Sequence, residues 1–460
     1  MAEAVAGNRA GSSRAAGFGL AVISVTALFF IWAFVTNLID PLVKSMKVIY
    51  TLSDFEAQLN QFAFFIAYGV MSIPAAGYLA RRGYAASIVL GLTGIIAGCI
   101  VAWSTTFSHS FVTVLAGLFI AASGITLLQV AANPLIASMG DQKGAHFRLN
   151  LSQAFNSLGA YAGGTFGAAF LLKGDLFKQG MVLTDALKAD GLSFVTGVYL
   201  TIAAALALFT AFVFVSRRTI AAHAPATAAH AESPLSALRS RWANLGAIAI
   251  FLYVGAEVCV ISGMIFFLEQ KQILNVPSQI AGYITPYFML LAMVGRFVGS
   301  ALLRKFAATG MLTLVASGAS ILCLIVIATF GMAASPLGGA ITLGGVAIPI
   351  TAGFIPAIAA ISLGLFNSIM FPTIFTLTLE RSSAPASATS GLMCMAICGG
   401  GFISLAFGGV VDMFTQMVPV GARSLAFVVP LGCYLYVLWF ALAARSAPTH
   451  AIEEGTAVGH

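Results

Sequence analysis

The sequence predicts an all-α integral membrane protein with twelve transmembrane helices, arranged in two pseudo-symmetric halves of six. Three observations predict this fold class. Of the 460 residues, 60% are hydrophobic and only 8% are charged, whereas about 25% of residues are charged in a typical soluble domain. Apolar stretches of about 20 residues, enough to cross roughly 30 Å of hydrocarbon as a helix, recur along the chain. The two halves of the chain also repeat each other's pattern of basic pairs and prolines.

Twelve apolar stretches are long enough to span a bilayer as helices. The first, residues 18–39, is too long for the core of a signal peptide and lacks a convincing cleavage site, so we interpret it as the first transmembrane helix. The stretches begin near Phe18, Ala57, Ala86, Phe111, Phe147, Ser193, Ala243, Gln279, Met311, Gly353, Pro385 and Ala422.

The placement of basic residues predicts the orientation of these helices. Starting from a cytoplasmic N-terminus, 14 of the 22 Lys and Arg residues fall on one side, seven fall on the other, and Arg296 lies within a span. Cytoplasmic loops carry the excess of Lys and Arg. We therefore expect a bacterial inner-membrane protein with both termini in the cytoplasm, and we read the net charge of +7 as topology and not as nucleic-acid binding.

The stretch from Arg217 to Arg241 is polar, low in complexity and rich in Ala, His, Pro and Ser, and it divides the spans six and six. The two halves repeat a pattern at similar offsets. The basic pairs Arg81-Arg82 and Arg304-Lys305, after the second and eighth spans, are 223 residues apart, and Pro134 and Pro372 are 238 residues apart. A Gly/Pro-rich insertion around Met332 to Thr351 accounts for the difference. The expected parts are a cytoplasmic tail (1–17), a six-helix half (18–216), a cytoplasmic linker (217–242), a second six-helix half (243–444) and a cytoplasmic tail (445–460).

Several function classes are excluded or disfavoured by the residues. The six cysteines all fall inside apolar spans, which argues against disulfides, and Cys394 and Cys398 share a helical face without a His or acid to complete a metal site. No histidine lies deep in a span, and no GxxxxGK[ST] motif for ATP is present. Paired catalytic groups are also lacking. We expect no metal, no cofactor and no enzymatic activity.

Glu257 is the most informative single residue, because it lies near the middle of the uncharged apolar run from Ala243 to Leu268. A charge at the bilayer centre costs roughly 2.5–3.5 kcal/mol on insertion scales, so such residues usually face a cavity and mark ion or substrate pathways. Asp40, at the end of the first span, is either a second such acid or a solvated helix-end residue. Arg296 either neutralises an acid, binds a carbonyl, or extends toward the cytoplasm.

Carboxamides are concentrated in the N-terminal half. Gln129 and Asn133 share a helical face beside Pro134, which breaks the backbone ladder, and three further amides recur at three-residue steps at positions 150, 153 and 156. These amides either pair between helices or bind a polyhydroxylated sugar, whose hydroxyls both donate and accept as an amide does. Trp32 and Tyr253 either form an apolar platform for the sugar or pack in the core.

The run Gly399-Gly400-Gly401 in the eleventh span weakens a helix, and we weigh a hinge that bends during a transport cycle against simple packing. Elsewhere glycines recur at i,i+4, as in Gly159-Gly163-Gly167, which is typical of closely packed membrane helices.

With these motifs the chain resembles the fucose/glucose–galactose permease family of the major facilitator superfamily across all twelve spans. The runs that carry the resemblance are FFIWAFVTNLIDPLV, LLQVAANPL, HFRLNLSQAFNSLGA, FLYVGAEV, GRFVG and FPTIFTLTLE. The resemblance implies the major facilitator fold and uptake of a monosaccharide coupled to a cation, generally a proton, by alternating access.

The resemblance also implies roles for individual residues. Asp40 matches the acid at the end of the first helix, and Asn37 a neighbouring sugar contact. Fucose permeases carry an acid where this chain has Gln129, and they carry a Gln where this chain has Glu257. In these two positions the chain resembles the glucose/galactose branch, which also includes N-acetylglucosamine permeases. Phe371 replaces a tyrosine of the fucose permeases. The candidate substrate contacts are Trp32, Asn37, Gln129, Asn133, Asn150, Gln153, Asn156, Tyr253 and Asn367, the candidate cation-coupling pair is Asp40 and Glu257, and Arg296 is the candidate for charge pairing or gating.

We therefore expect a sugar symporter that uses H+ or Na+ and functions as a monomer in the lipid bilayer. One alternative is a facilitator or exporter of sugars or drugs on the same fold without cation coupling. Another is a membrane sensor or scaffold, although the short N-terminus and the tail after Ala444 leave no room for a signalling domain.

Overall fold

The computed structural model describes the protein in nine segments that leave several loops and both termini aside. Residue contacts divide the chain into two compact units, the first comprising residues up to Ala243 together with Ser382–Met395, and the second comprising Asn244–Arg381 and Ala396–Thr449. The described residues are 19, 21–37, 49–50, 54–171, 184–224, 234–332, 335–343, 346–418 and 420–449.

The first unit is helical in its described part. Its longest helix, α2, runs through two predicted spans and is interrupted at Gly83, whose φ of 79° and ψ of 174° lie outside the helical region. Glycine tolerates that conformation because it has no Cβ. The elements are a helix at Ala21–Asn37, α2 (Asp54–Trp103), α3 (Thr105–Ser108), α4 (Phe111–Ser138), η1 (Gln142–Gly144), α5 (Ala145–Leu171), α6 (Asp185–Ala222), η3 (Pro234–Arg239) and α13 (Ala386–Met395).

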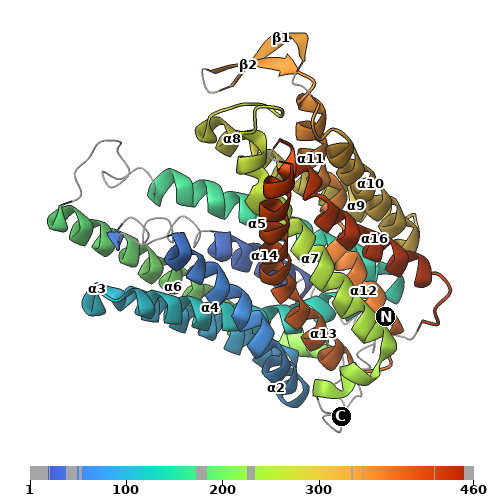
Figure 1. The fold of residues 1–460 in the computed structure, drawn as a ribbon. Coiled ribbons are helices and arrows are strands. Elements are labelled where there is room, and N and C mark those ends of the chain that lie inside the picture. Colours follow the sequence, from blue (N-terminus) through green and yellow to red (C-terminus); the bar gives the residue numbers. More distant parts are fainter. Residues whose placement is uncertain are drawn as a thin grey trace, which may run out of the picture. The chain divides into compact units, whose positions relative to one another are not determined.

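Close backbone approach organises the packing of this unit. Helix α2 packs along α4 and also contacts α6, as Figure 1 shows. Helix α5 lies against the helix at Ala21–Asn37 through Gly159 and Gly163, where an added Cβ would overlap the backbone oxygens of Phe30 and Phe34. The i,i+4 glycines therefore form the contact that small residues allow between membrane helices.

The second unit contains the remaining helices and a two-stranded sheet. Helix α9 starts with Pro286 at its first position, where the missing N–H costs no helical hydrogen bond. The elements are α7 (Arg241–Leu268), α8 (Ser278–Ile284), α9 (Pro286–Leu302), α10 (Ala308–Ala328), β1 (Pro336–Leu343), β2 (Val346–Thr351), α11 (Phe354–Asn367), α12 (Met370–Arg381), η4 (Ala396–Cys398), α14 (Gly399–Met417), α15 (Ala422–Leu425) and α16 (Val428–Ala443).

The Gly/Pro-rich insertion of the second half forms the hairpin β1–β2. Its strands pair antiparallel, with Leu343 opposite Val346 and Ile341 opposite Ile348. In Figure 1 the hairpin projects beyond the end of α10 and α11. The insertion that offsets the two sequence repeats is thus a folded element at the end of the helices.

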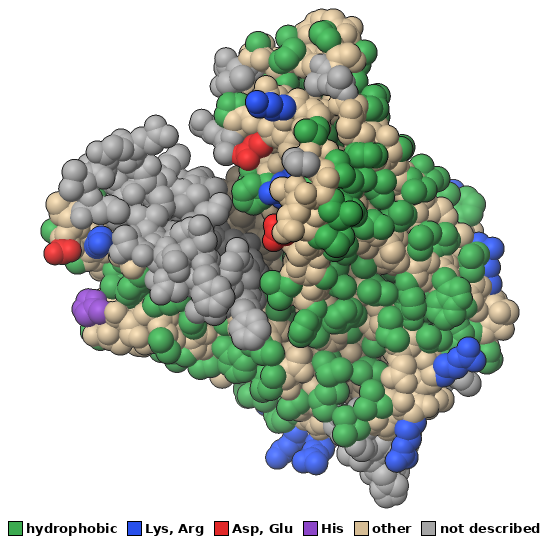
Figure 2. Space-filling view, in the orientation of Figure 1, with side chains coloured by type: hydrophobic (Ala, Val, Ile, Leu, Met, Phe, Trp, Pro, Cys, Tyr) green, Lys and Arg blue, Asp and Glu red, His purple; other side chains and the backbone are tan. Residues whose placement is uncertain are grey.

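The helices have the length and surface of membrane spans. Within the described residues, nine helical segments are long and apolar enough to cross a membrane. One of them, Ala63–Ser108, contains two predicted spans separated by Gly83. The first and fifth predicted stretches fall on the shorter apolar helix Ala21–Asn37 and on α5, which are not among these nine segments. Large apolar side chains such as Leu314, Ile321 and Trp439 are exposed, and hydrophobic side chains cover much of the visible surface of the second unit in Figure 2.

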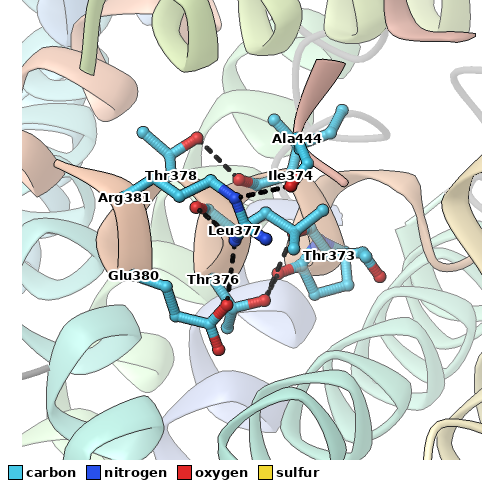
Figure 3. A network of polar contacts seen from close by, with 9 residues as sticks. Thr373, Ile374, Thr376, Leu377, Thr378, Glu380, Arg381 and Ala444 are labelled. Atoms are coloured by element: carbon cyan, nitrogen blue, oxygen red, sulfur yellow. Dashed lines mark hydrogen bonds and ion pairs between the residues drawn. The ribbon is translucent and has the colours of Figure 1, made fainter. Parts of the chain in front are cut away.

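A buried arginine fastens two helix ends in the second unit, as Figure 3 shows. The Nε of Arg381 donates a 3.0 Å hydrogen bond to the backbone oxygen of Ala444, and its Nη1 donates to the oxygen of Leu377 and to Oε2 of Glu380 at 3.3 and 3.1 Å. A cation at the end of a helix is stabilised by the helix dipole. Arg381 therefore joins the end of α12 to the end of α16.

The eleventh predicted span is not one continuous helix. Helix α13 ends at Met395, a 3-10 turn occupies Ala396–Cys398, and α14 begins at Gly399. An added Cβ at Gly399 would overlap the backbone oxygen of Phe251 on α7. The irregularity thus lies just before the triple glycine, and Gly399 itself is a close-packing position.

Candidate functional site

Carboxamides of α4 and α5 meet inside the first unit. Nε2 of Gln153 donates a 3.4 Å hydrogen bond to Oδ1 of Asn133, and Nδ2 of Asn133 has no hydrogen-bond partner among the described residues. Gln129 lies one helical turn before Asn133, so the i,i+4 spacing puts both amides on one face of α4. We call Gln129, Asn133 and Gln153 the amide cluster.

The other two amides of α5 are held differently. Nδ2 of Asn156 donates a 3.0 Å hydrogen bond to the backbone oxygen of Phe29. Nδ2 of Asn150 donates to the oxygen of His146 on its own helix, and the buried Oδ1 of Asn150 has no partner among the described residues. Asn156 thus ties α5 to the first helix, while Asn150 keeps one unsatisfied acceptor.

Tyr68 of α2 completes the amide cluster and was missed by the sequence reasoning. The Nε2 of Gln129 donates a 2.6 Å hydrogen bond to the Tyr68 hydroxyl. The thiol of Cys394 on α13 lies beside Tyr68 and beside Asn133. Tyrosines are common in membrane spans, so the sequence does not single out Tyr68. Its contact with the amide cluster becomes visible only in the structure, where α2 brings it against Gln129 of α4.

Two candidates lie on the first helix. Trp32 is 4% exposed, and its ring lies 4.3 Å from that of Phe29, centroid to centroid. Nδ2 of Asn37 donates to the backbone oxygen of Ala33 at 2.9 Å. Asp40 lies outside the described residues. Because Asn156 of α5 donates to the Phe29 oxygen, the helical turn that contains Phe29 and Trp32 lies next to α5.

Two of the three charged candidates, Glu257 and Arg296, lie close to each other in the second unit. Glu257 and Tyr253 are one turn apart on α7, and the guanidinium of Arg296 on α9 lies beside both the Tyr253 hydroxyl and the Glu257 carboxylate. The Tyr253 hydroxyl donates a 3.1 Å hydrogen bond to the backbone oxygen of Asn367. Glu257 is therefore a partly buried acid with a counter-charge beside it.

Asn367 is fully buried at the end of α11. Neither Nδ2 nor Oδ1 of its side chain has a well-aligned hydrogen bond within the described structure, although the Tyr434 hydroxyl of α16 lies close to the amide. An unpaired buried amide costs free energy comparable to a lost hydrogen bond. The buried Asn367 amide thus lies beside Tyr434, while its backbone oxygen and that of Ser368 accept hydrogen bonds from Tyr253 and Arg296.

Arg296 also satisfies a backbone oxygen. Its Nε donates a 3.0 Å hydrogen bond to the oxygen of Ser368. Pro372 lies four residues later and has no N–H, so the Ser368 oxygen cannot accept the usual helical hydrogen bond. Of the roles that the sequence left open for Arg296, the structure shows a carbonyl contact and the proximity of an acid.

These groups can bind an uncharged polar molecule and can take up or release a proton. The amide cluster offers paired donors and acceptors without charge, which suits hydroxyl groups. Glu257 offers a titratable carboxylate beside a fixed cation. In the described part of the chain no three His, Cys, Asp or Glu residues come together as metal ligands, and all six cysteines are free thiols.

Comparison with known proteins places these features in a family context. The sequence profile described as Major Facilitator Superfamily matches residues 25–405. A protein of Brucella abortus named glucose/galactose transporter is 36% identical over 92% of this chain and 94% of its own length. The protein named L-fucose-proton symporter of Escherichia coli is 30% identical over 90% of this chain and 91% of its own.

A solved structure supports the same placement. The crystal structure of the major facilitator transporter FucP in the outward conformation aligns with a TM-score of 0.77 and 27% identity, covering 93% of this chain and 99% of that chain. This likeness confirms the fold class predicted from the sequence.

Proposed function

Because the chain belongs to the major facilitator superfamily, a family of multi-pass membrane transporters, we propose that it imports a monosaccharide of the glucose/galactose class by symport with a cation, with the proton as the first candidate. Transport proceeds by alternating access, in which one central site opens to each side in turn. The proposal places the protein in a bacterial inner membrane with both termini in the cytoplasm.

The observation that carries the proposal is the amide cluster. Gln129, Asn133 and Gln153 converge from α4 and α5, with the Tyr68 hydroxyl at one end and the Cys394 thiol beside Asn133, whose Nδ2 has no well-aligned partner among the described residues. A sugar hydroxyl both donates and accepts, and an amide answers both needs. Each well-formed hydrogen bond to such a group discriminates strongly against molecules that lack it, because the protein group is then left unpaired.

The relatives support this substrate class. The Brucella abortus relative is named for glucose and galactose, and the Escherichia coli relative for L-fucose and a proton. Gln129 stands where fucose permeases carry an acid, so in this chain the acid of the symport site is Glu257 on α7. Asn37, Asn150, Asn156 and Asn367 add donors and acceptors, and Trp32 and Tyr253 add ring surface for the apolar face of a sugar.

Glu257 is proposed as the proton carrier in the second unit. It is partly buried on α7 and lies beside Arg296 and Tyr253, so a change in its protonation changes the charge balance of the pair. Asp40 is the proposed second acid. One proton that enters down about 150 mV supplies roughly 3.5 kcal/mol, which sustains sugar accumulation of several hundredfold.

The test is uptake by purified protein in proteoliposomes under imposed gradients. Labelled glucose is offered with an inward proton gradient, with an inward sodium gradient or with neither, and unlabelled galactose, mannose, fucose and N-acetylglucosamine compete in parallel. We expect accumulation that follows the proton gradient and is lost when a protonophore is added. Counterflow without accumulation under either gradient identifies a facilitator and contradicts the symport proposal.

A further inference from the structure

One end of the Gln129 amide is held by Tyr68. Nε2 of Gln129 on α4 donates a 2.6 Å hydrogen bond to the Tyr68 hydroxyl on α2. Among the residues that the structure describes, this is the one hydrogen bond of the Gln129 side chain. An amide has its donors at the nitrogen and its acceptor at the oxygen. The bond to Tyr68 therefore leaves Oε1 as the end that is available to another molecule.

The Tyr68 hydroxyl is itself fixed by its surroundings. Tyr68 is only 3% exposed, and its ring lies 5.5 Å from that of Phe64, centroid to centroid. Oγ of Ser72, one turn later on α2, donates a 2.7 Å hydrogen bond to the backbone oxygen of Tyr68. Packed side chains have little room to change rotamer. Tyr68 is thus a rigid support for the longer and more flexible side chain of Gln129.

Gln129 differs in exposure from the other two amides of the amide cluster. Asn133 and Gln153 are buried, and Oδ1 of Asn133 accepts a hydrogen bond from Nε2 of Gln153 at 3.4 Å. Gln129 is half-buried, so part of its side chain is accessible from outside the core. Of the three amides, Gln129 is therefore the one best placed to meet an incoming molecule.

An acceptor with a fixed direction selects a donor. A sugar hydroxyl can turn its hydrogen toward Oε1, whereas a fluorine or an ether oxygen in the same place presents only lone pairs. A freely rotating amide could meet fluorine with Nε2 instead, but the hydrogen bond to Tyr68 opposes that rotation. Because the amide is already ordered, the bound sugar also does not have to order it.

We propose that Tyr68 is a positioning residue of the sugar site, which holds Nε2 of Gln129 and thereby presents Oε1 as the acceptor for one hydroxyl of the substrate. The inference rests on the proposed function and deepens it. It adds a requirement for a hydrogen-bond donor at one ring position of the sugar, which the amide composition of the site does not itself specify.

The test is binding of D-glucose, D-galactose and a series of monodeoxy and monodeoxyfluoro glucoses, measured by isothermal titration on the purified full chain. A deoxy analogue lacks one hydroxyl, and the matching fluoro analogue carries an acceptor there. In the wild type we expect one ring position at which the fluoro analogue binds about 3- to 10-fold more weakly than the deoxy analogue, because fluorine faces Oε1.

Tyr68→Phe should raise the Kd of glucose by about 3- to 10-fold. At the selected ring position it should also bring the Kd values of the fluoro and deoxy analogues together, because the amide is then free to turn. Tyr199→Phe is the matched control. Its hydroxyl is likewise buried in the first unit and has no partner among the described residues, so its loss should leave every Kd ratio unchanged.

Gln129→Met gives a second arm that stands when Tyr68→Phe does not fold. It has no amide and should remove the difference between the fluoro and deoxy analogues at the same position. A Tyr68→Phe variant that weakens all analogues by one factor overturns the inference, and so does a wild type without any such position. A wild type that binds none of these sugars overturns the proposed function as well, whereas binding with a uniform pattern overturns the inference alone.

Discussion

The guanidinium of Arg296 donates a 3.0 Å hydrogen bond to the backbone oxygen of Ser368, the oxygen that Pro372 leaves without its helical donor. The oxygen left by Pro134 is satisfied by Ser390 in the same manner. Each sequence repeat therefore contains a proline that leaves one backbone oxygen without its helical donor, and a side chain from another helix supplies the missing hydrogen bond. The donor is the neutral Ser390 in one repeat and the charged Arg296 in the other. The charged donor stands beside Glu257.

Removing the charge of Arg296 should destabilise the protein, because Glu257 is then left without its counter-charge. We expect Arg296→Met to lower the free energy of unfolding by about 1–3 kcal/mol, because it leaves the Ser368 oxygen without its donor and the partly buried Glu257 carboxylate without its counter-charge. Arg296→Met combined with Glu257→Gln should recover part of that loss. Thermal unfolding in detergent measures the effect, and a double variant as unstable as the sum of the single variants contradicts the pairing.

Glu257→Gln should abolish uphill accumulation while sparing sugar exchange. The amide keeps the shape and hydrogen bonds of the side chain but cannot carry a proton. Counterflow and gradient-driven uptake in the same proteoliposomes separate the two activities. Glu269→Gln, one residue beyond the end of α7, is the matched control and should accumulate sugar normally. Accumulation that persists in Glu257→Gln rules out this residue as the coupling acid.

Gln129→Leu should weaken sugar binding and also lower the free energy of unfolding by about 1–3 kcal/mol, because the buried Tyr68 hydroxyl loses its donor. It removes the donor to the Tyr68 hydroxyl and one edge of the amide cluster, and we expect the sugar Kd to rise about 10- to 100-fold, which corresponds to one or two lost hydrogen bonds. Equilibrium binding by isothermal titration gives the Kd. Gln270→Leu, in the turn after α7, serves as the control. An unchanged Kd in Gln129→Leu places the sugar elsewhere.

Gly159→Ala should destabilise the first unit, whereas Gly164→Ala on the same helix should not. The Cβ at position 159 would overlap the Phe30 oxygen, while nothing lies within 4 Å of the Cβ position at 164. Overpacking of this kind costs about 1–3 kcal/mol, and an Ala at an open helical position is neutral or slightly stabilising. Melting temperatures of the two variants test this, and equal shifts would argue against the close helix contact.

The sequence alone predicted the features that depend on a single helix. Hydropathy predicted twelve stretches, and nine helical segments of the described residues have the length and apolar content of membrane spans, one of them containing two predicted stretches. The i,i+4 spacing put Gln129 and Asn133 on one face, and Pro134 marked a free carbonyl. The triple glycine pointed to an irregular eleventh span, and the structure has its break directly before Gly399.

Features that depend on which helices are neighbours could not be predicted in this way. The roles of Tyr68 and Ser390 arise from contacts 61 and 260 residues away in the chain, and periodicity carries no information about such distances. Serine and tyrosine are also ordinary residues in spans, so neither stood out by type. The hairpin was noticed only as a Gly/Pro-rich insertion, although its β-branched residues are typical of strands.

The hairpin β1–β2 has a practical consequence for imaging. Single-particle reconstruction of a small membrane protein depends on a rigid landmark outside the detergent micelle. The two strands leave the helices at Pro336 and return at Thr351, and the side chains of Leu337 and Ile341 on β1 are exposed. A nanobody epitope grafted between the strands would be held by two polypeptide connections instead of one, so its orientation would report directly on the tilt of α10 and α11.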